Sequence, residues 1–149
     1  MSLLLMNIHN IHSCLKIICD VESDILDSSI KNFFKRKNYD GNEEMLNVVS
    51  YKLYEIHGEL DNYHSESSGI NRVVCDAMEY VRSLISSTKQ LISLNGQLRN
   101  KSNGGRYSLT QYNMDLSEFW RLQENYCILG DRLTTDYKLY ALEIERYED

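Results

Sequence analysis

The chain has 149 residues, of which 26% are charged and 42% hydrophobic, and its formal net charge is −6. This length suits one domain with one core, and the composition is that of a folded protein rather than a disordered one. The negative charge disfavours nucleic acid and anionic membranes as partners. Proline is absent, which favours long, uninterrupted helices.

Clusters of Gly, Asn, Asp and Ser divide the chain at residues 38–42, 62–69 and 100–106. Between these clusters the apolar residues recur every three or four positions, as they do in helices, and no segment alternates with the period of a strand. We therefore predict an all-α fold that is at least about 70% helical. The expected architecture is an antiparallel four-helix bundle with coiled-coil-like helices at about residues 3–37, 43–64, 70–100 and 109–147.

The first predicted helix has one apolar seam at its start and a second after a slip in phase, with a possible bend at residues 27–29. The two seams are Leu4, Ile8, Ile11, Leu15 and Ile18, then Val21, Ile25, Ile30 and Phe33. The spacing of His9 and His12 would let both bind one metal ion, but no further ligands are signalled. We read them as ordinary histidines on the flank of a helix.

The start of the chain is apolar, but Asn7, His9, Asn10 and His12 interrupt it and no Lys or Arg precedes them. We expect neither a signal peptide nor a membrane span there. The four cysteines form no C-x-x-C pair and fall on or beside apolar stripes. This pattern favours free thiols, a reducing compartment and hence the cytoplasm.

The second predicted helix begins after a cap at Asn42. The third, residues 70–100, has the most regular pattern, an unbroken four-three alternation typical of a coiled coil. We expect Val81 and Leu84 to be buried in this seam. Asn95 occupies a core position, where it would either fix register and partner choice or mark a frayed helix end.

The fourth predicted helix starts with a capping box formed by Ser108 and Gln111. At a rise of 1.5 Å per residue it would be about 58 Å long, against about 33 Å for the second helix. Part of its seam would then lack a cover from the same chain. That seam is rich in aromatic residues, and tyrosine suits a half-wet interface better than a dry core.

We therefore expect this Tyr-rich column to bind another protein or a second copy of the chain. Its candidate residues are Tyr112, Phe119, Tyr126, Tyr137, Tyr140 and Tyr147. Alternatively, the rings lie at the edge of the bundle and their hydroxyl groups face water.

Basic residues gather in two places that an up-down topology brings to the same end. This predicted basic tip consists of Lys31, Lys35, Arg36, Lys37, Arg99, Lys101 and Arg106. It would suit an acidic partner or a phosphate. Alternatively, these cations are there because positive charge stabilises helix C-termini.

The sequence contains no P-loop, dinucleotide-binding, zinc-protease, serine-hydrolase or EF-hand motif. We therefore predict no catalytic residue, metal or cofactor. In size and helicity the chain resembles the four-helix ribonucleases of the higher eukaryote and prokaryote nucleotide-binding (HEPN) type, but it lacks their motif of Arg followed four to six residues later by His. The preferred hypothesis is a non-enzymatic protein-binding bundle: an adaptor, a chaperone or an inhibitor of the immunity type. A small helical enzyme or nucleic-acid-associated protein is the alternative.

Overall fold

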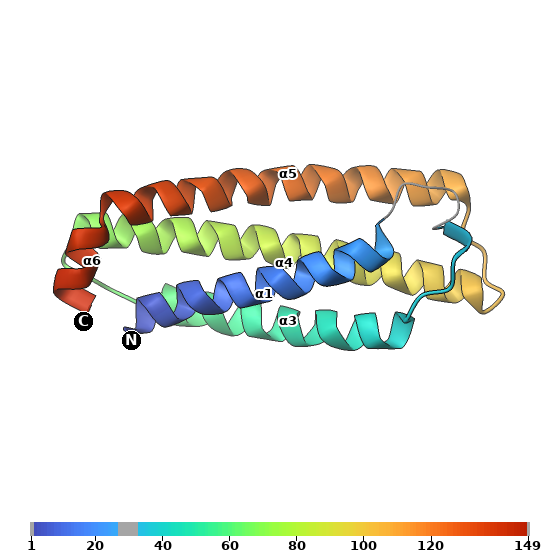
Figure 1. The fold of residues 1–149 in the computed structure, drawn as a ribbon, viewed down its shortest axis with the longest axis horizontal. Helices are drawn as coiled ribbons and strands as arrows, with labels where there is room; N and C mark the ends of the chain where they lie inside the picture. The colour runs from blue at the N-terminus through green and yellow to red at the C-terminus, as the bar shows by residue number, and fades with distance from the viewer. Residues whose placement is uncertain (1, 27–32, 149) are drawn as a thin grey trace.

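The computed structural model describes residues 2–26 and 33–148 and shows an entirely helical protein (Figure 1). Over these residues 86% are helical and none forms a strand. The helices described are α1 (Leu3–Ile25), α3 (Tyr39–Asp61), α4 (Ser68–Ser102), α5 (Leu109–Leu139) and α6 (Ala141–Glu148). The predicted all-α class and helical content are confirmed.

The four long helices alternate in direction, and the short α6 lies across one end of them (Figure 1). Helix α4 is central, because it packs against α3, α5 and α1, while α1 also packs against α3. Both ends of the chain lie at the α6 end (Figure 1). No helix in the described part of the chain is long and apolar enough to cross a membrane.

Three predicted boundaries in the first half of the chain are wrong, the smallest error being the end of the second helix at Asp61 and not at residue 64. Helix α1 ends at Ile25, not at residue 37, because Leu26 leaves the helical conformation; the possible bend at 27–29 lies outside the described residues. Helix α3 begins at Tyr39, since Asn38 and not Asn42 is its cap: the Asn38 side chain accepts a hydrogen bond from the Gly41 N–H at 3.2 Å. Such caps satisfy backbone donors that the first helical turn leaves unpaired.

The predicted fourth helix is divided in two. Helix α5 ends at Leu139 and α6 starts at Ala141, because Tyr140 adopts non-helical angles (φ −105°, ψ 15°). The Ser108 cap is confirmed, since its hydroxyl accepts the Gln111 N–H at 3.0 Å. The capping box is incomplete, however, because the Gln111 side chain donates to Asp115 instead. At helical rise α5 is only about 12 Å longer than α3, so the predicted overhang is much reduced.

The core follows the predicted seam at every position in α4 and at most positions in α1. The predicted four-three seam of α4 is buried at every position: Ile70, Val74, Ala77, Val81, Leu84, Thr88, Leu91, Asn95 and Leu98. Val81 and Leu84 are fully buried, as predicted. In α1 the buried residues form one unbroken alternation: Leu4, Asn7, Ile11, Cys14, Ile18, Val21 and Ile25. The slip in phase does not occur, because the seam uses Asn7 and Cys14 in place of Ile8 and Leu15. Asn7 is tolerated there because its amide donates to the Leu3 carbonyl at 3.0 Å.

Candidate protein-binding surfaces

The first part of the Tyr-rich column belongs to the chain's own core. Tyr112, Phe119 and Tyr126 are all at most 4% exposed. The Tyr112 hydroxyl donates to the Ile25 carbonyl at 3.0 Å, and its ring packs against Phe33 with 5.1 Å between centroids. In the folded chain these three rings are covered, and they offer no surface to a partner.

The Tyr126 hydroxyl group also finds its partner inside the chain. It donates to the Glu22 carboxylate at 3.3 Å, which joins α5 to α1. The Gln123 side chain donates to the same carboxylate. Burial raises the pKa of Glu22, although these two hydrogen bonds oppose the rise. Burial also raises the pKa of Tyr126, so this contact joins a neutral phenol to a carboxylate.

The end of the column is more accessible. Tyr137 and Tyr140 are half-buried, and Tyr147 is 63% exposed. Tyr140 lies directly over Gly69 in α4, where an added Cβ would overlap its ring. Below it, the Ser67 hydroxyl donates to the Glu143 carboxylate. These two contacts fasten α6 to the start of α4.

A cleft of about 840 Å³ lies beside this junction, between α6 and the loop that precedes α4. Its walls include His64, Glu66, Glu143 and Arg146, with Tyr147 at the side. Within the described part of the chain, no three His, Cys, Asp or Glu side chains converge as metal ligands. The cleft is lined by side chains of both charges and by the exposed ring of Tyr147.

The two basic clusters do meet at one end of the molecule, as predicted. Lys101 from α4 lies over the rings of Phe33 and Phe34, 4.5 and 4.7 Å from their centroids. Lys35, Arg36 and Arg106 are exposed, and the segments that carry them, before α3 and between α4 and α5, lie at the same end of the molecule (Figure 1). Lys31 lies outside the described residues.

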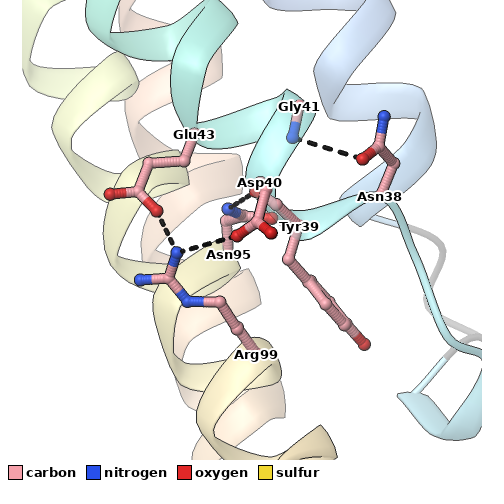
Figure 2. Close-up of polar contacts among 7 residues, drawn as sticks. All are labelled: Asn38, Tyr39, Asp40, Gly41, Glu43, Asn95 and Arg99. Atoms are coloured by element: carbon pink, nitrogen blue, oxygen red, sulfur yellow. Dashed lines mark hydrogen bonds and ion pairs between the residues drawn. The ribbon is translucent and has the colours of Figure 1, made fainter.

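Two other members of the basic tip are already engaged within the chain. The Lys37 side chain is buried, and its ammonium group donates to the Lys35 carbonyl at 3.1 Å. Arg99 forms ion pairs with Glu43 and Asp40 in the first turns of α3 (Figure 2). The charge of Arg99 is therefore offset within the chain, whereas Lys35, Arg36 and Arg106 are exposed.

Asn95 faces the chain's own α3. It is buried, and its amide donates to the Tyr39 carbonyl at 2.9 Å, beside the Arg99 ion pairs (Figure 2). Its Oδ1 atom has no hydrogen-bond partner among the described residues. Asn95 thus fixes where α3 starts relative to α4, and the helix is not frayed there. Its predicted role in choosing an external partner receives no support from this position.

A pair of buried carboxyl groups joins α4 to α5 near the α6 end. Asp76 and Asp136 are 8% and 4% exposed, and Arg72 donates to Asp136 at 3.1 Å. Burial, with the hydrogen bond to Asp136, raises the pKa of Asp76 to about 7. The hydrogen bond from Asp76 lowers the pKa of Asp136. Two acids of different pKa suit acid–base chemistry, but the burial of both side chains makes this pair a contact between helices.

Tyr51 on α3 is the most exposed aromatic residue of the described chain, and it belongs to none of the predicted sites. On α3, Val48, Tyr51 and Tyr54 are 61%, 75% and 51% exposed. They follow one another at intervals of three on the side away from the buried seam. The Lys89 ammonium of α4 lies 5.6 Å from the centre of the Tyr54 ring and closes one side of this group. We call Val48, Tyr51 and Tyr54 the α3 face.

A signal for the α3 face does exist in the sequence. The buried seam of α3 is Leu46, Val49, Leu53, Ile56 and Leu60. Once this seam is assigned, Val48, Tyr51 and Tyr54 are apolar residues left on the solvent side, where polar residues are expected. The three residues are found only when the positions outside the seam are inspected as well.

Comparisons with known proteins identify no relative: no protein-family model, curated protein or solved structure matches this chain.

Proposed function

We propose that this chain is a non-enzymatic protein-binding module, and that the α3 face is its contact surface. The observation that carries the proposal is the exposure of Tyr51 and Tyr54 beside Val48 on one rigid helix. Tyrosine is enriched at binding hot spots, because a large ring with few rotatable bonds contributes much contact area at a small entropic cost. Three adjacent exposed apolar side chains are more than a solvated helix face requires.

The α3 face is held in place before any partner arrives. Five apolar residues on the opposite side of α3 are at most 1% exposed and pack in the core. At its start, α3 is fixed by the Asn38 cap, by Asn95 and by the ion pairs to Arg99 (Figure 2). A preorganised helix loses little conformational entropy on binding, and this favours useful affinity from a small surface.

The remaining exposed part of the Tyr-rich column is a secondary contact in this proposal. Leu139, Leu142 and Tyr147 are 66%, 81% and 63% exposed around the α5–α6 junction. Of these three, Leu142 and Tyr147 line the cleft, whose other walls carry mixed charges. We also place the protein in the cytoplasm, a proposal that its free cysteines support.

The proposal can be tested by photo-crosslinking from Tyr51. A benzoylphenylalanine residue replaces Tyr51 in the full chain, and the same residue replaces Glu124, which is exposed on α5, as a matched control. After irradiation in lysate of the source cells, we expect one specific crosslinked protein from position 51 and none in common with position 124. Equal products from both positions, or none from position 51, would overturn the proposal.

A further inference from the structure

We infer that the partner of the α3 face is a basic amphipathic helix of another protein, lying along α3. This inference rests on the proposed function and specifies its partner.

Almost all of the net charge of the chain lies on α3. The helix contains six acidic residues and one basic residue, a net charge of −5, so the rest of the chain contributes only −1 to the total of −6. The acidic residues are Asp40, Glu43, Glu44, Glu55, Glu59 and Asp61. Glu43 and Asp40 pair with Arg99, and Glu55 pairs with Lys52. In the described part of the chain, Glu44, Glu59 and Asp61 belong to no ion pair, and they lie before and after the α3 face along the helix.

The acidic groups bracket the apolar ones along the helix. Glu44 precedes the α3 face by one turn, and Glu55 and Glu59 follow it, all three exposed. An apolar centre with a charged rim is the usual anatomy of a binding site on a protein surface. From Glu44 to Glu59 the surface is about 24 Å long, which corresponds to four or five turns of a partner helix.

Gly58 gives the partner a place to approach closely. It lies seven residues after Tyr51, two helical turns further along nearly the same side, and no atom lies within 4 Å of where its Cβ would be. Small residues let the backbones of two helices come near each other. Asn47, Tyr51, Tyr54 and Gly58 follow the four-three spacing that a helix seated lengthwise would contact.

The acidic residues around the α3 face favour a basic helix over a second copy of the chain as its partner. A second copy that docked through its own α3 face would bring two acidic rims together, and like charges across an interface cost affinity. A helix with apolar residues on one side and Lys or Arg at its flanks places opposite charges against Glu44, Glu55 and Glu59. The partner would pack lengthwise against α3 as one amphipathic helix against another, through an apolar side flanked by basic residues.

The test uses a designed peptide and the full-length protein. The probe is a labelled amphipathic helix of about 18 residues, long enough for the 24 Å surface, with Leu on one side and Lys on the other. Its twin replaces every Lys with Glu. Binding is measured by fluorescence anisotropy at about 50 and 500 mM salt, because screening weakens exposed charge pairs. We expect the basic peptide to bind at low salt and the acidic twin not to bind.

Matched variants locate the binding site. The rim variant E44Q/E55Q/E59Q and the remote variant E124Q/D131N/E145Q remove the same number of charges, and all six side chains are exposed. We expect the rim variant and Y51S/Y54S each to bind the basic peptide at least tenfold more weakly, and the remote variant less than twofold. Circular dichroism confirms that each variant is folded. Equal weakening by the rim and remote variants, or binding of the acidic twin, would overturn the inference.

The two proposals fail separately. If Tyr51 crosslinks one partner but excess basic peptide does not displace it, the partner is of another kind and only this inference is wrong. Crosslinking of Tyr51 to a second copy of the chain likewise contradicts this inference alone. If Tyr51 crosslinks nothing, the proposed function fails as well.

Discussion

Replacing Gly69 with alanine places a methyl group where the ring of Tyr140 lies. A Cβ on Gly69 would be 2.6 Å from Cε1 and 2.9 Å from Cγ of that ring, well inside ordinary van der Waals contact. The ring has to swing away, and with it the junction between α5 and α6. Overpacking of this kind costs about 1–3 kcal/mol, and the better helix propensity of alanine returns at most about 1 kcal/mol. We expect a net loss of about 1–2 kcal/mol, or roughly 2–8 °C in Tm.

The control is Gly96→Ala on the same helix. No atom lies within 4 Å of a Cβ at Gly96, so this change should stabilise the protein by about 0.5–1 kcal/mol. Thermal and urea unfolding of both variants are then repeated in a Tyr140→Ala background. If the ring is the cause, Gly69→Ala no longer destabilises the protein there. Stabilisation by Gly69→Ala alone, or an unchanged loss in the Tyr140→Ala background, refutes the reasoning.

Three further changes test the core and the polar contacts. Leu84→Ala should cost about 2–5 kcal/mol, because it leaves a cavity in the fully buried α4 seam; an unmoved urea midpoint would place that seam at the surface. Asn95→Asp should cost about 1–3 kcal/mol, because the buried donor to the Tyr39 carbonyl is replaced by an acceptor; calorimetry at neutral pH measures this, and an unchanged Tm contradicts it. Folding raises the pKa of Asp76 from 3.8 to about 7, so the folded state holds a proton more tightly and stability should fall as pH rises from about 4 to 7, by a few kcal/mol in total. The lowered pKa of Asp136 acts only below about pH 4, and Asp76→Asn should remove the slope between pH 4 and 7; a slope that persists in this variant belongs to other groups.

The sequence predicted helices and their buried sides best where local spacing is the main determinant. The α4 seam is correct at every position because helices pack against it on several sides and its polar side chains donate hydrogen bonds inside the chain. Thr88, for example, donates to the Leu84 carbonyl at 2.7 Å. In α1, spacing alone preferred Ile8 and Leu15 to Asn7 and Cys14. The choice between these two alternations depends on how α1 is rotated against α3 and α4, which is a tertiary property.

The role of the Tyr-rich column could not be predicted for the same reason. A tyrosine is stable in a core if its hydroxyl group has a partner, and the partners of Tyr112 and Tyr126 are on α1, far away in the sequence. The Tyr140 ring, at the break between α5 and α6, likewise packs over a distant residue, Gly69. The exposed rings of α3 could have been predicted from the sequence, because their position follows once the buried seam of α3 is assigned correctly.

The unequal burial of the helices also sets the order in which the molecule opens. About half of the residues of α4 are buried, against about a fifth of those of α5. Local unfolding begins where few apolar groups are covered, so amide hydrogens at the end of α5 and in α6 should exchange with solvent long before those in the middle of α4. Helix α3 packs mainly against α4 and α1. The α5–α6 end can therefore open and close while the α3 face keeps its shape.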